Sequence, residues 1–445
     1  MEKRQNSLEK EISRTAKKFL EKIKNKQIEV ISHFDTDGIS SAAIMIKTLK
    51  KLDKRFSVRI LKRIENDFIK SLPKDKIILF LDLASGSLDE IKKANLQDVF
   101  IIDHHEITQK IPENIEIVNP ELYDKQKISA SGLTYLFCKE INPKNKEFAK
   151  LAMLGMIGDS LGGEIGRLNH DILKDSEVKK KRGLLIYPAT RPLNRVLEFS
   201  SNPYIPGVTG NIKGVLELLR EISLNPSNKG YPSLIELNEE EMSKLVTAIM
   251  LRNPKAKNKE IIGDIFLLKM YNKLEDAREI SAKINACSRL GESSIALQLC
   301  MEIPKIRKKA EALHARYRQM IVSGLKFVTE NEKIIGKNFI IINAKDHIKD
   351  TMIGTIISIL SNSLLYEEGT IIIGMAYYKN KVKVSARNVG NKGRNTREIL
   401  QNSLEDIKGE VGGHKFAAGC MLNQEDEKLF INNLKKHLEI ELIKI

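Results

Sequence analysis

Acidic and imidazole side chains stand at the ends of several apolar segments of this chain of 445 residues. In the stretch "HFDTDG", His33, Asp35 and Asp37 alternate, so an extended segment places them on one face, where a turn could curl them around an ion. Gly38 then allows a sharp turn into a helix. An acid that caps this helix is a simpler interpretation, but it accounts for only one of the three residues.

A second group follows an apolar run in the stretch "IIDHHE", where Asp103, His104 and His105 are adjacent. Asp82 and Asp159 stand at the ends of two further apolar segments. Read alone, "DHH" also fits a structural histidine pair at the end of a strand. Read together, the four segments gather carboxylates that would be costly without partners, and bound divalent cations remove that cost.

The mixture of carboxylates and imidazoles narrows the choice of metal. Sites built only from oxygen suit Mg²⁺ and Ca²⁺, and sites built only from thiolates suit zinc. We therefore expect Mn²⁺, with Mg²⁺, Co²⁺ or Zn²⁺ as alternatives. Six ligands are too many for one ion with open positions and suit two ions that share an aspartate. Two such ions can generate a hydroxide nucleophile and support in-line displacement at phosphorus, so the expected reaction is hydrolysis of a phosphoester.

Short apolar segments that alternate with helical patterns must position these residues. The expected strands are Ile28–Ser32, Ser57–Leu61, Lys76–Leu81, Asp98–Ile102 and Ile115–Val118. The expected helices cover about 8–23, 39–52, 129–140 and 147–159. This alternation predicts an α/β fold with a mostly parallel sheet, in which ligands gather beyond the carboxyl ends of the strands.

The pattern of expected helices and strands changes after Asp159. Residues 212–335 are expected to be mainly helical, and Glu302–Met320 could form a long connecting helix. A second α/β pattern comprises strand Phe339–Asn343, helix Met352–Leu365, strands Thr370–Ala376 and Val382–Ala386, and a helix from about Glu425. We therefore expect a catalytic domain at 1–205, a helical intervening region at 206–336 and a smaller C-terminal α/β domain at 337–445.

The composition favours an anionic partner. The formal net charge is +16, which points to nucleic acid before membrane. The basic run "EVKKKRG", 177–183, fits a solvated surface at least as well as a phosphate contact. No apolar run approaches the roughly 20 residues that cross a bilayer, and the charged N-terminus has no signal core, so we expect a cytoplasmic protein. No C-x-x-C pair occurs, and we expect core cysteines at Cys138, Cys287, Cys300 and Cys420.

These motifs resemble the DHH phosphoesterase superfamily. "SHFDTDG", Asp82 in "LFLDLAS", "IDHHE" and "GMIGD" match its four motifs in order and spacing, and "GGHKFAAG" is similar to the glycine-rich signature of the DHHA1 domain. The middle stretches "RGLLIYPATRPLNRVLEFSSNPYIPG" and "INACSRLGESSIALQLC" are similar to archaeal RecJ-like nucleases, which are related to the eukaryotic replication factor Cdc45. The resemblance covers nearly the whole chain.

The resemblance implies a role for each residue of the motifs. It places His33, Asp35 and Asp82 around one metal ion. It places a second ion, with Asp82 bridging, among Asp37, Asp82, His104 and Asp159. It makes Asp103 a support that accepts the other N–H of an imidazole, expected to be that of His104. It directs His105 at the scissile phosphate or the leaving group.

In the second domain, the family's substrate-binding positions fall on Gly412, Gly413, His414 and Arg387. Glycines let backbone N–H groups approach a phosphate, and arginine offers two parallel donors. For "GGHKFAAG", a tight turn into a packed helix is the alternative. Arg289 in "ACSRLG" is a further candidate for a phosphate contact, and an ordinary surface ion pair explains it equally well.

The leading hypothesis is an exonuclease that acts on single-stranded DNA, RNA or both. A replisome scaffold of the Cdc45 type, bound to the GINS complex and the replicative helicase, is one alternative. An oligoribonuclease or small-nucleotide phosphatase of the same superfamily is another, although the stretch between Pro206 and Lys337 favours a longer substrate or a protein partner. The polarity of degradation and the choice between DNA and RNA stay open.

Overall fold

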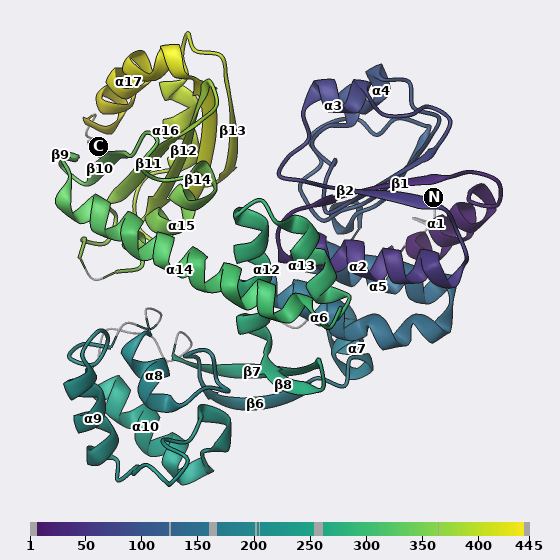
Figure 1. Cartoon of the computed structure of the whole chain (residues 1–445). Coiled ribbons are helices and arrows are strands. Elements are labelled where there is room, and N and C mark those ends of the chain that lie inside the picture. The colour runs from purple at the N-terminus through teal and green to yellow at the C-terminus, as the bar shows by residue number, and fades with distance from the viewer. Residues whose placement is uncertain are drawn as a thin grey trace, which may run out of the picture. The chain divides into compact units, whose positions relative to one another are not determined.

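The computed structural model describes residues 7–439 apart from 124–125, 160–166, 201–202, 204, 253–260 and 364. The chain divides into two compact units, Met1–His314 (unit 1) and Ala315–Ile445 (unit 2), each described by itself below (Figure 1). Among the described residues, no helix combines the length and the apolar character needed to cross a membrane. The division at 1–205, 206–336 and 337–445 stays a prediction.

A five-stranded parallel sheet is the centre of unit 1. Its strands are β1 (Ile28–His33), β2 (Phe56–Leu61), β3 (Ile77–Leu81), β4 (Asp98–Ile102) and β5 (Ile115–Val118), in the order β2-β1-β3-β4-β5. The predicted parallel sheet is confirmed. β3 and β4 are buried at every position, because a parallel sheet covered by helices on both faces has no polar side.

Helices cover both faces of this sheet. In Figure 1, α3 (Asn66–Lys70) and α4 (Leu88–Lys93) lie on one side of β1 and β2, and α2 (Thr36–Lys51) and α5 (Ala130–Ile141) lie on the other. Strand residues alternate between the two cores: Leu79 packs with the α2 side and Phe80 with the α4 side. Helices α1 (Leu8–Lys22) and α6 (Ala149–Gly158) belong to the α2 side.

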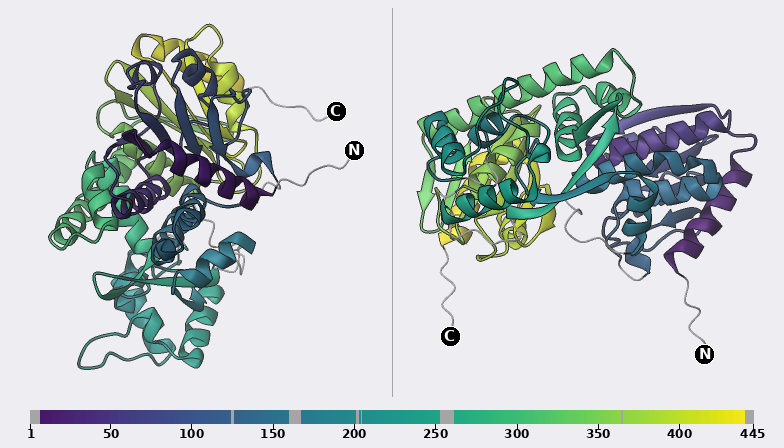
Figure 2. Two further views of the ribbon diagram at one scale, coloured as in Figure 1. Left: turned by 90° about the vertical axis from the view of Figure 1, so that its right-hand side faces the viewer. Right: turned by 90° about the horizontal axis from the view of Figure 1, so that it is seen from below.

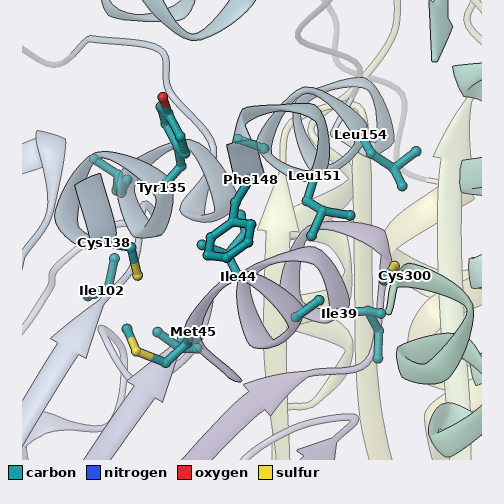
Figure 3. Close-up of a cluster of buried hydrophobic side chains, with 14 of the residues drawn as sticks. Ile39, Ile44, Met45, Ile102, Tyr135, Cys138, Phe148, Leu151, Leu154 and Cys300 are labelled. Carbon is teal, nitrogen blue, oxygen red and sulfur yellow. The ribbon is translucent and has the colours of Figure 1, made fainter. Parts of the chain in front are cut away.

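Helix α2 is buried along most of its length, since α5, α6 and α13 (Ser293–Cys300) all pack against it. Figure 3 shows Ile44 and Met45 of α2 among Phe148, Leu151 and Cys138, all within one apolar cluster. The predicted core cysteines are confirmed, because all four are free and buried. This packing holds the start of α2 rigidly at the end of β1.

The expectation of a mainly helical stretch at 212–335 is wrong in part, because two strands interrupt it. β7 (Ile262–Met270) and β8 (Lys273–Asp276) form an antiparallel sheet with β6 (Lys179–Leu184), which contains most of the basic run. Lys180 and Arg182 pair with Asp264 of β7 at 2.7 and 3.5 Å. β6 is mostly basic and lacks the apolar alternation that marks a strand, whereas β7 is a largely apolar run, which a sequence does not distinguish from a buried helical segment.

Helices account for most of the remaining described residues of unit 1. They are α7 (Arg167–Asp175), α8 (Leu193–Glu198), α9 (Ile212–Glu221), α10 (Glu239–Arg252) and α12 (Ala277–Arg289). The connecting helix is α14 (Ile306–Glu330), visible as a long green helix in the right-hand view of Figure 2. It begins later than predicted, because Glu302 has φ of 56° and cannot continue a right-handed helix. Part of the loop predicted at 200–211 lies outside the described residues.

Unit 2 is built on a six-stranded mixed sheet. Its strands are β9 (Ile334–Gly336), β10 (Phe339–Asn343), β11 (Ile371–Tyr378), β12 (Lys381–Asn388), β13 (Gly409–His414) and β14 (Ala417–Asn423), in the order β13-β14-β12-β11-β10-β9. Its helices are α15 (Asp350–Ser361), α16 (Thr396–Ser403) and α17 (Glu427–Glu439). The predicted α/β character is confirmed. The stretch "GGHKFAAG" forms a β-hairpin rather than a turn into a helix.

Candidate metal centre

The turn between β1 and α2 carries three of the predicted residues. Asp35 caps α2, since its Oδ1 accepts a hydrogen bond from the Gly38 N–H at 3.1 Å. Any Cβ at Gly38 would lie 2.3 Å from the His33 carbonyl oxygen, so the turn requires glycine at this position. The capping interpretation of Asp35 is therefore confirmed, and the same turn keeps His33 and Asp37 beside the capping carboxylate.

The other candidate residues also follow the ends of elements. Asp82 comes directly after β3 with φ of 58°, and Asp103 comes directly after β4. Asp159 is the residue that ends α6. The parallel strands deliver their carboxyl ends to one edge of the sheet, which is where a ligand site was expected.

One set of donors comprises His33, Asp35 and Asp82. His33 Nδ1 lies 2.9 Å from Asp35 Oδ2 and 3.4 Å from Asp82 Oδ2. These three residues each place a ligand atom within 4.8 Å of the others. Asp82 is almost completely buried, so its carboxylate has little access to water.

A second set comprises Asp37, His104 and Asp159, which also meet within 4.8 Å. His104 Nε2 lies 3.3 Å from Asp82 Oδ1 and 3.4 Å from Asp159 Oδ2. Asp82 therefore presents Oδ2 to the first set and Oδ1 to the second. This is the arrangement in which one carboxylate can bridge two cations.

The N-terminus of α5 fixes Asp37. Asp37 Oδ2 accepts from the Ala130 N–H at 2.7 Å, and Oδ1 accepts from the Ser131 N–H at 3.0 Å. Backbone N–H groups at a helix N-terminus favour a negative charge. Asp37 lies in the first turn of α2, but it is the neighbouring helix α5 that orients its carboxylate.

The electrostatics of the second set show crowding of like charges. Burial raises the pKa of Asp159 to about 9, helped by the neighbouring Asp37 carboxylate. Burial, with the Asp82 charge, raises the pKa of Asp37 to about 6. Burial acts to lower the pKa of His104, but its interaction with the Asp82 carboxylate and the charge of Asp37 outweigh this effect and raise that pKa to about 10. Without a cation, the cluster holds protons that ordinary carboxylates release.

Two buried oxygens in the cluster make no hydrogen bond within the described part of the chain: Asp82 Oδ1 and Asp159 Oδ2. A buried carboxylate oxygen without a donor is costly, and a cation satisfies it. The donor set of four carboxylates and two imidazoles also suits a divalent ion such as Mn²⁺. The residues present therefore fit the metal ions that the sequence predicted.

Asp103 and His105 form a pair beside these two sets. His105 Nδ1 lies 2.7 Å from Asp103 Oδ1, and Asp103 is buried while the His105 side chain is 56% exposed. The hydrogen bond to Asp103 raises the pKa of His105. Asp103 was expected to support the His104 ring, but the ring that its carboxylate contacts is that of His105, and its Oδ1 accepts only from the backbone N–H of His104, at 2.8 Å.

Several residues that support the site carried no signal in the sequence. The backbone N–H of Thr36, between Asp35 and Asp37, donates to Asn285 Oδ1 at 3.1 Å, and the Thr36 hydroxyl lies 3.0 Å from Ser281 Oγ. Both partners lie on α12. Serine and asparagine are common on surfaces, so only the fold reveals that these two hold the metal-binding turn.

The predicted substrate residues fall in both units. Arg289 is the last residue of α12, one helical turn beyond Asn285, and is half-buried. Arg387 lies on β12 of unit 2, where its Nε donates to Ser358 Oγ at 3.2 Å and its Nη1 to the Ala386 carbonyl at 2.8 Å. No acidic side chain of the described residues pairs with it, and burial lowers the pKa of its guanidinium.

Gly412, Gly413 and His414 lie on β13, which is an edge strand of the unit 2 sheet. All three are exposed. Gly413 has φ of 109°, and a Cβ there would lie 2.4 Å from the Ala417 carbonyl oxygen, whereas a Cβ at Gly412 would meet nothing within 4 Å. The conformation of the hairpin requires glycine at 413, but it does not require glycine at 412.

Comparisons with protein families match three parts of the chain. The DHH family N-terminal domain matches residues 27–156, the DHH-CID domain matches 187–260 and the DHHA1 domain matches 336–439. An uncharacterized protein of Methanocaldococcus jannaschii is 28% identical and covers 96% of each chain. The single-stranded-DNA-specific exonuclease RecJ of Bacillus subtilis is 23% identical over 90% of this chain, which spans only 44% of that relative.

Solved structures show a similar fold. RecJ from Thermus thermophilus in complex with Mn²⁺ aligns with a TM-score of 0.61 at 18% identity, covering 98% of this chain and 55% of that one. CDC45 from Entamoeba histolytica aligns with a TM-score of 0.66 at 12% identity, covering 96% of this chain and 99% of that one. The order of domains is thus that of RecJ-like proteins.

Proposed function

Because the chain belongs to the RecJ-like proteins of the DHH/DHHA1 superfamily, we propose that it is a metal-dependent exonuclease that hydrolyses phosphodiester bonds in single-stranded DNA or RNA. The observation that carries this proposal is Asp82, whose two oxygens face two separate sets of metal-binding groups. A scaffold protein would have no need for a buried carboxylate in this position.

We assign His33, Asp35 and Asp82 to one divalent ion, and Asp37, Asp82, His104 and Asp159 to a second, with Mn²⁺ preferred. When bound, such ions supply a nucleophile from water at neutral pH and stabilise charge on the phosphoryl oxygens. The chain's own contribution is to hold six side chains from four segments in place before substrate arrives. The hydrogen bonds from α5 to Asp37 and from the Thr36 N–H to Asn285 of α12 provide that rigidity.

His105 is the group of the cluster that we assign to the substrate. Asp103 holds its Nδ1, so Nε2 is the ring nitrogen that can meet a phosphate oxygen or the leaving oxygen. Since the hydrogen bond to Asp103 raises the pKa of His105, the protonated ring is favoured, and we assign its Nε2–H as the donor to that oxygen. Its exposure distinguishes it from His33 and His104, whose side chains are 19% and 24% exposed.

We assign binding of the nucleic acid to unit 2, through Arg387 and the exposed strand Gly412–His414, with Arg289 of unit 1 as a further phosphate contact. Arg387 is a half-buried cation whose Nε and Nη1 are used within unit 2, which leaves Nη2 for an anion. Such phosphate contacts make binding weaken as salt rises. On a single strand, the logarithm of the binding constant falls with the logarithm of the salt concentration with a slope of about −0.7 per contact.

Hydrolysis of DNA and RNA 20-mers, labelled at each end in turn, tests the proposal. We expect stepwise release of nucleotides with Mn²⁺, none with EDTA, and none from the double variant Asp82→Ala, Asp159→Ala. Activity that survives either treatment would contradict the metal-dependent mechanism. A strong preference for dinucleotides or phosphoadenosine phosphate over the 20-mers would favour an oligoribonuclease or small-nucleotide phosphatase instead.

A replisome scaffold of the Cdc45 type is the second candidate, favoured by the fold similarity to CDC45 over nearly all of that chain. An enzyme can also be part of a replisome. In that case we propose a role in DNA replication or repair and a cytoplasmic location. Co-purification with the GINS complex and the replicative helicase tests this candidate. Binding to these partners by a protein that cleaves no substrate would replace the exonuclease proposal.

A further inference from the structure

A closed ring of hydrogen bonds lies behind the Asp103–His105 pair in unit 1. Asn119 Nδ2 donates to the His105 carbonyl oxygen at 2.9 Å and to Ser85 Oγ at 3.0 Å. The Ser85 N–H donates to Asp103 Oδ2 at 3.0 Å. Asp103 Oδ1 accepts from His105 Nδ1, which closes the ring.

Each hydrogen-bonding group in the ring has one possible role. Both oxygens of Asp103 accept from backbone N–H groups, Oδ2 from Ser85 at 3.0 Å and Oδ1 from His104 at 2.8 Å, as the oxygens of a carboxylate do. His105 Nδ1 must then donate. Asn119 is completely buried and uses both Nδ2 hydrogens in the ring, while its Oδ1 accepts from the Glu121 N–H at 2.9 Å. Aspartate lacks the two donors that this position needs.

His105 needs such support because packing does not fix it. Its side chain is 56% exposed, and it follows β4 in a loop without regular structure. The ring holds the residue at both ends: Asn119 binds its carbonyl oxygen, and Asp103 binds its imidazole. The imidazole is thereby kept beside the metal-binding cluster, with Nδ1 3.9 Å from Asp82 Oδ1.

We propose that Asn119 and Ser85 are positioning residues that fix His105 for the reaction, without binding metal or substrate themselves. The inference rests on the proposed hydrolysis for its kinetic test. Its simplest rival is that Asn119 only caps the short helix η1 (Pro120–Leu122). The cap uses Oδ1 alone, so a substitution that keeps an acceptor and removes the donors separates the two roles.

Asn119→Ser is that substitution, since serine is a good helix cap and has no amide donors. Asn114→Ser is the matched control: Asn114 precedes β5 as Asn119 follows it, and its Nδ2 donates to the Leu96 carbonyl at 2.7 Å, far along the strand from the site. We expect Asn119→Ser to lower kcat about 10- to 100-fold while the Mn²⁺ concentration for half-maximal activity is unchanged. Asn114→Ser should leave both unchanged. Equal losses of kcat in the two variants would overturn the proposal.

A double-mutant cycle tests whether Asn119 acts through His105. In a His105→Ala background, Asn119→Ser should cause no further loss of kcat, because the group that it positions is already gone. A loss of the same size in both backgrounds would overturn the proposal, as would weaker Mn²⁺ affinity. Ser85→Ala should lower kcat less, since the backbone N–H of Ser85 still reaches Asp103. If Asn119→Ser does not fold, Ser85→Ala takes its place in the same cycle.

A readout without turnover separates this inference from the proposed function. If the wild type cleaves no phosphodiester with Mn²⁺, the proposed function fails, and the ring is tested by NMR of the chain with ¹⁵N-labelled histidine. We expect a slowly exchanging Nδ1–H signal from His105 in the wild type and in Asn114→Ser, and its loss in Asn119→Ser. Persistence of that signal in Asn119→Ser would overturn the positioning role.

Discussion

The candidate residues of unit 1 and unit 2 differ in burial and in the sign of their charge. In unit 1, aspartates and histidines from four segments crowd into a cluster in which some buried oxygens have no donor among the described residues. In unit 2, Gly412, Gly413 and His414 lie exposed on an edge strand, and the half-buried Arg387 pairs with no acidic side chain in the described part of the chain. The first region is suited to cations, and the second is suited to an anion.

The difference teaches where the folded structure is strained for function. Without a bound cation, the cluster of unit 1 lowers the stability of the folded chain. Burial and neighbouring carboxylates raise the pKa values of Asp37 and Asp159, which disfavours their charged forms. Unit 2 needs no such arrangement, since a solvated strand and one arginine are stable without ligand. Substitutions should therefore separate activity from stability in unit 1, and affinity from turnover in unit 2.

The largest effect is expected from Asp159→Asn. Loss of a carboxylate from the metal site should lower kcat about 10³-fold, as several kcal/mol of charge stabilisation disappear. At pH 8 the folded metal-free protein keeps a proton on Asp159, whose pKa is raised to about 9, and an amide avoids the free-energy cost of taking up that proton, so the melting temperature should rise. The exposed Asp171→Asn on α7 is the control and should change neither quantity. A fall in both activity and metal-free stability for Asp159→Asn would show that this carboxylate is structural.

A smaller effect is expected from Arg387→Ala in unit 2. Loss of charge-assisted hydrogen bonds to a phosphate should raise KM for a single-stranded 20-mer about tenfold to hundredfold, with kcat much less affected. Lys381→Ala, an exposed charge on the same strand, should leave KM nearly unchanged. A loss confined to kcat would contradict the assignment of Arg387 to binding.

The two glycines of β13 provide a matched pair. Gly413→Ala should destabilise unit 2 by about 1–3 kcal/mol, since φ of 109° and the Ala417 carbonyl oxygen leave no room for a methyl group. Gly412→Ala should leave stability unchanged, because its Cβ meets nothing. If a phosphate approaches this strand, Gly412→Ala should still raise KM a few-fold. Denaturant unfolding and steady-state kinetics on both variants measure these effects, and an unchanged KM in Gly412→Ala would remove Gly412 from the binding site.

The smallest effect is a dependence of stability on pH in the metal-free protein. Between pH 6 and pH 9 the folded chain keeps protons on Asp159 and His104, whose pKa values of about 9 and about 10 lie above those of the unfolded chain. The folded state then binds more protons than the unfolded state, so stability falls as pH rises. We expect a lower melting temperature at pH 9 than at pH 6 in EDTA, and a shallower slope in Asp159→Asn. A melting temperature that rises over this range would contradict the crowding of charge.

The sequence predicted the parallel sheet of unit 1 because its strands are short, wholly apolar runs such as "IILFL" in β3. It did not predict β6, whose Lys180 and Arg182 pair with Asp264 of β7. It also did not predict β7, a largely apolar run of nine residues, or the four-residue β8, or α16, an eight-residue helix of mixed polarity. Periodicity alone does not separate a short apolar strand from a buried helical segment, and a basic strand carries little apolar signal.

The site was predictable to a similar degree. The residue types and order of the acids and histidines pointed to a shared site, and the structure brings His33, Asp35, Asp37, Asp82, His104 and Asp159 together. Ser85, Asn119 and Asn285 could not be found in this way, since their importance depends on which groups the fold places beside them. The sequence likewise could not show which imidazole contacts the Asp103 carboxylate, because this depends on where the fold places the His104 and His105 rings.

Diffraction from crystals soaked in Mn²⁺, recorded at the manganese absorption edge, tests the central claim most directly. We predict two anomalous peaks about 3.5–4 Å apart, one among His33, Asp35 and Asp82 and one among Asp37, His104 and Asp159, with Asp82 between them. The same crystals of Asp82→Asn should lose one peak or both. The absence of any peak at this edge of the sheet, in crystals of protein that hydrolyses single strands, would contradict the account.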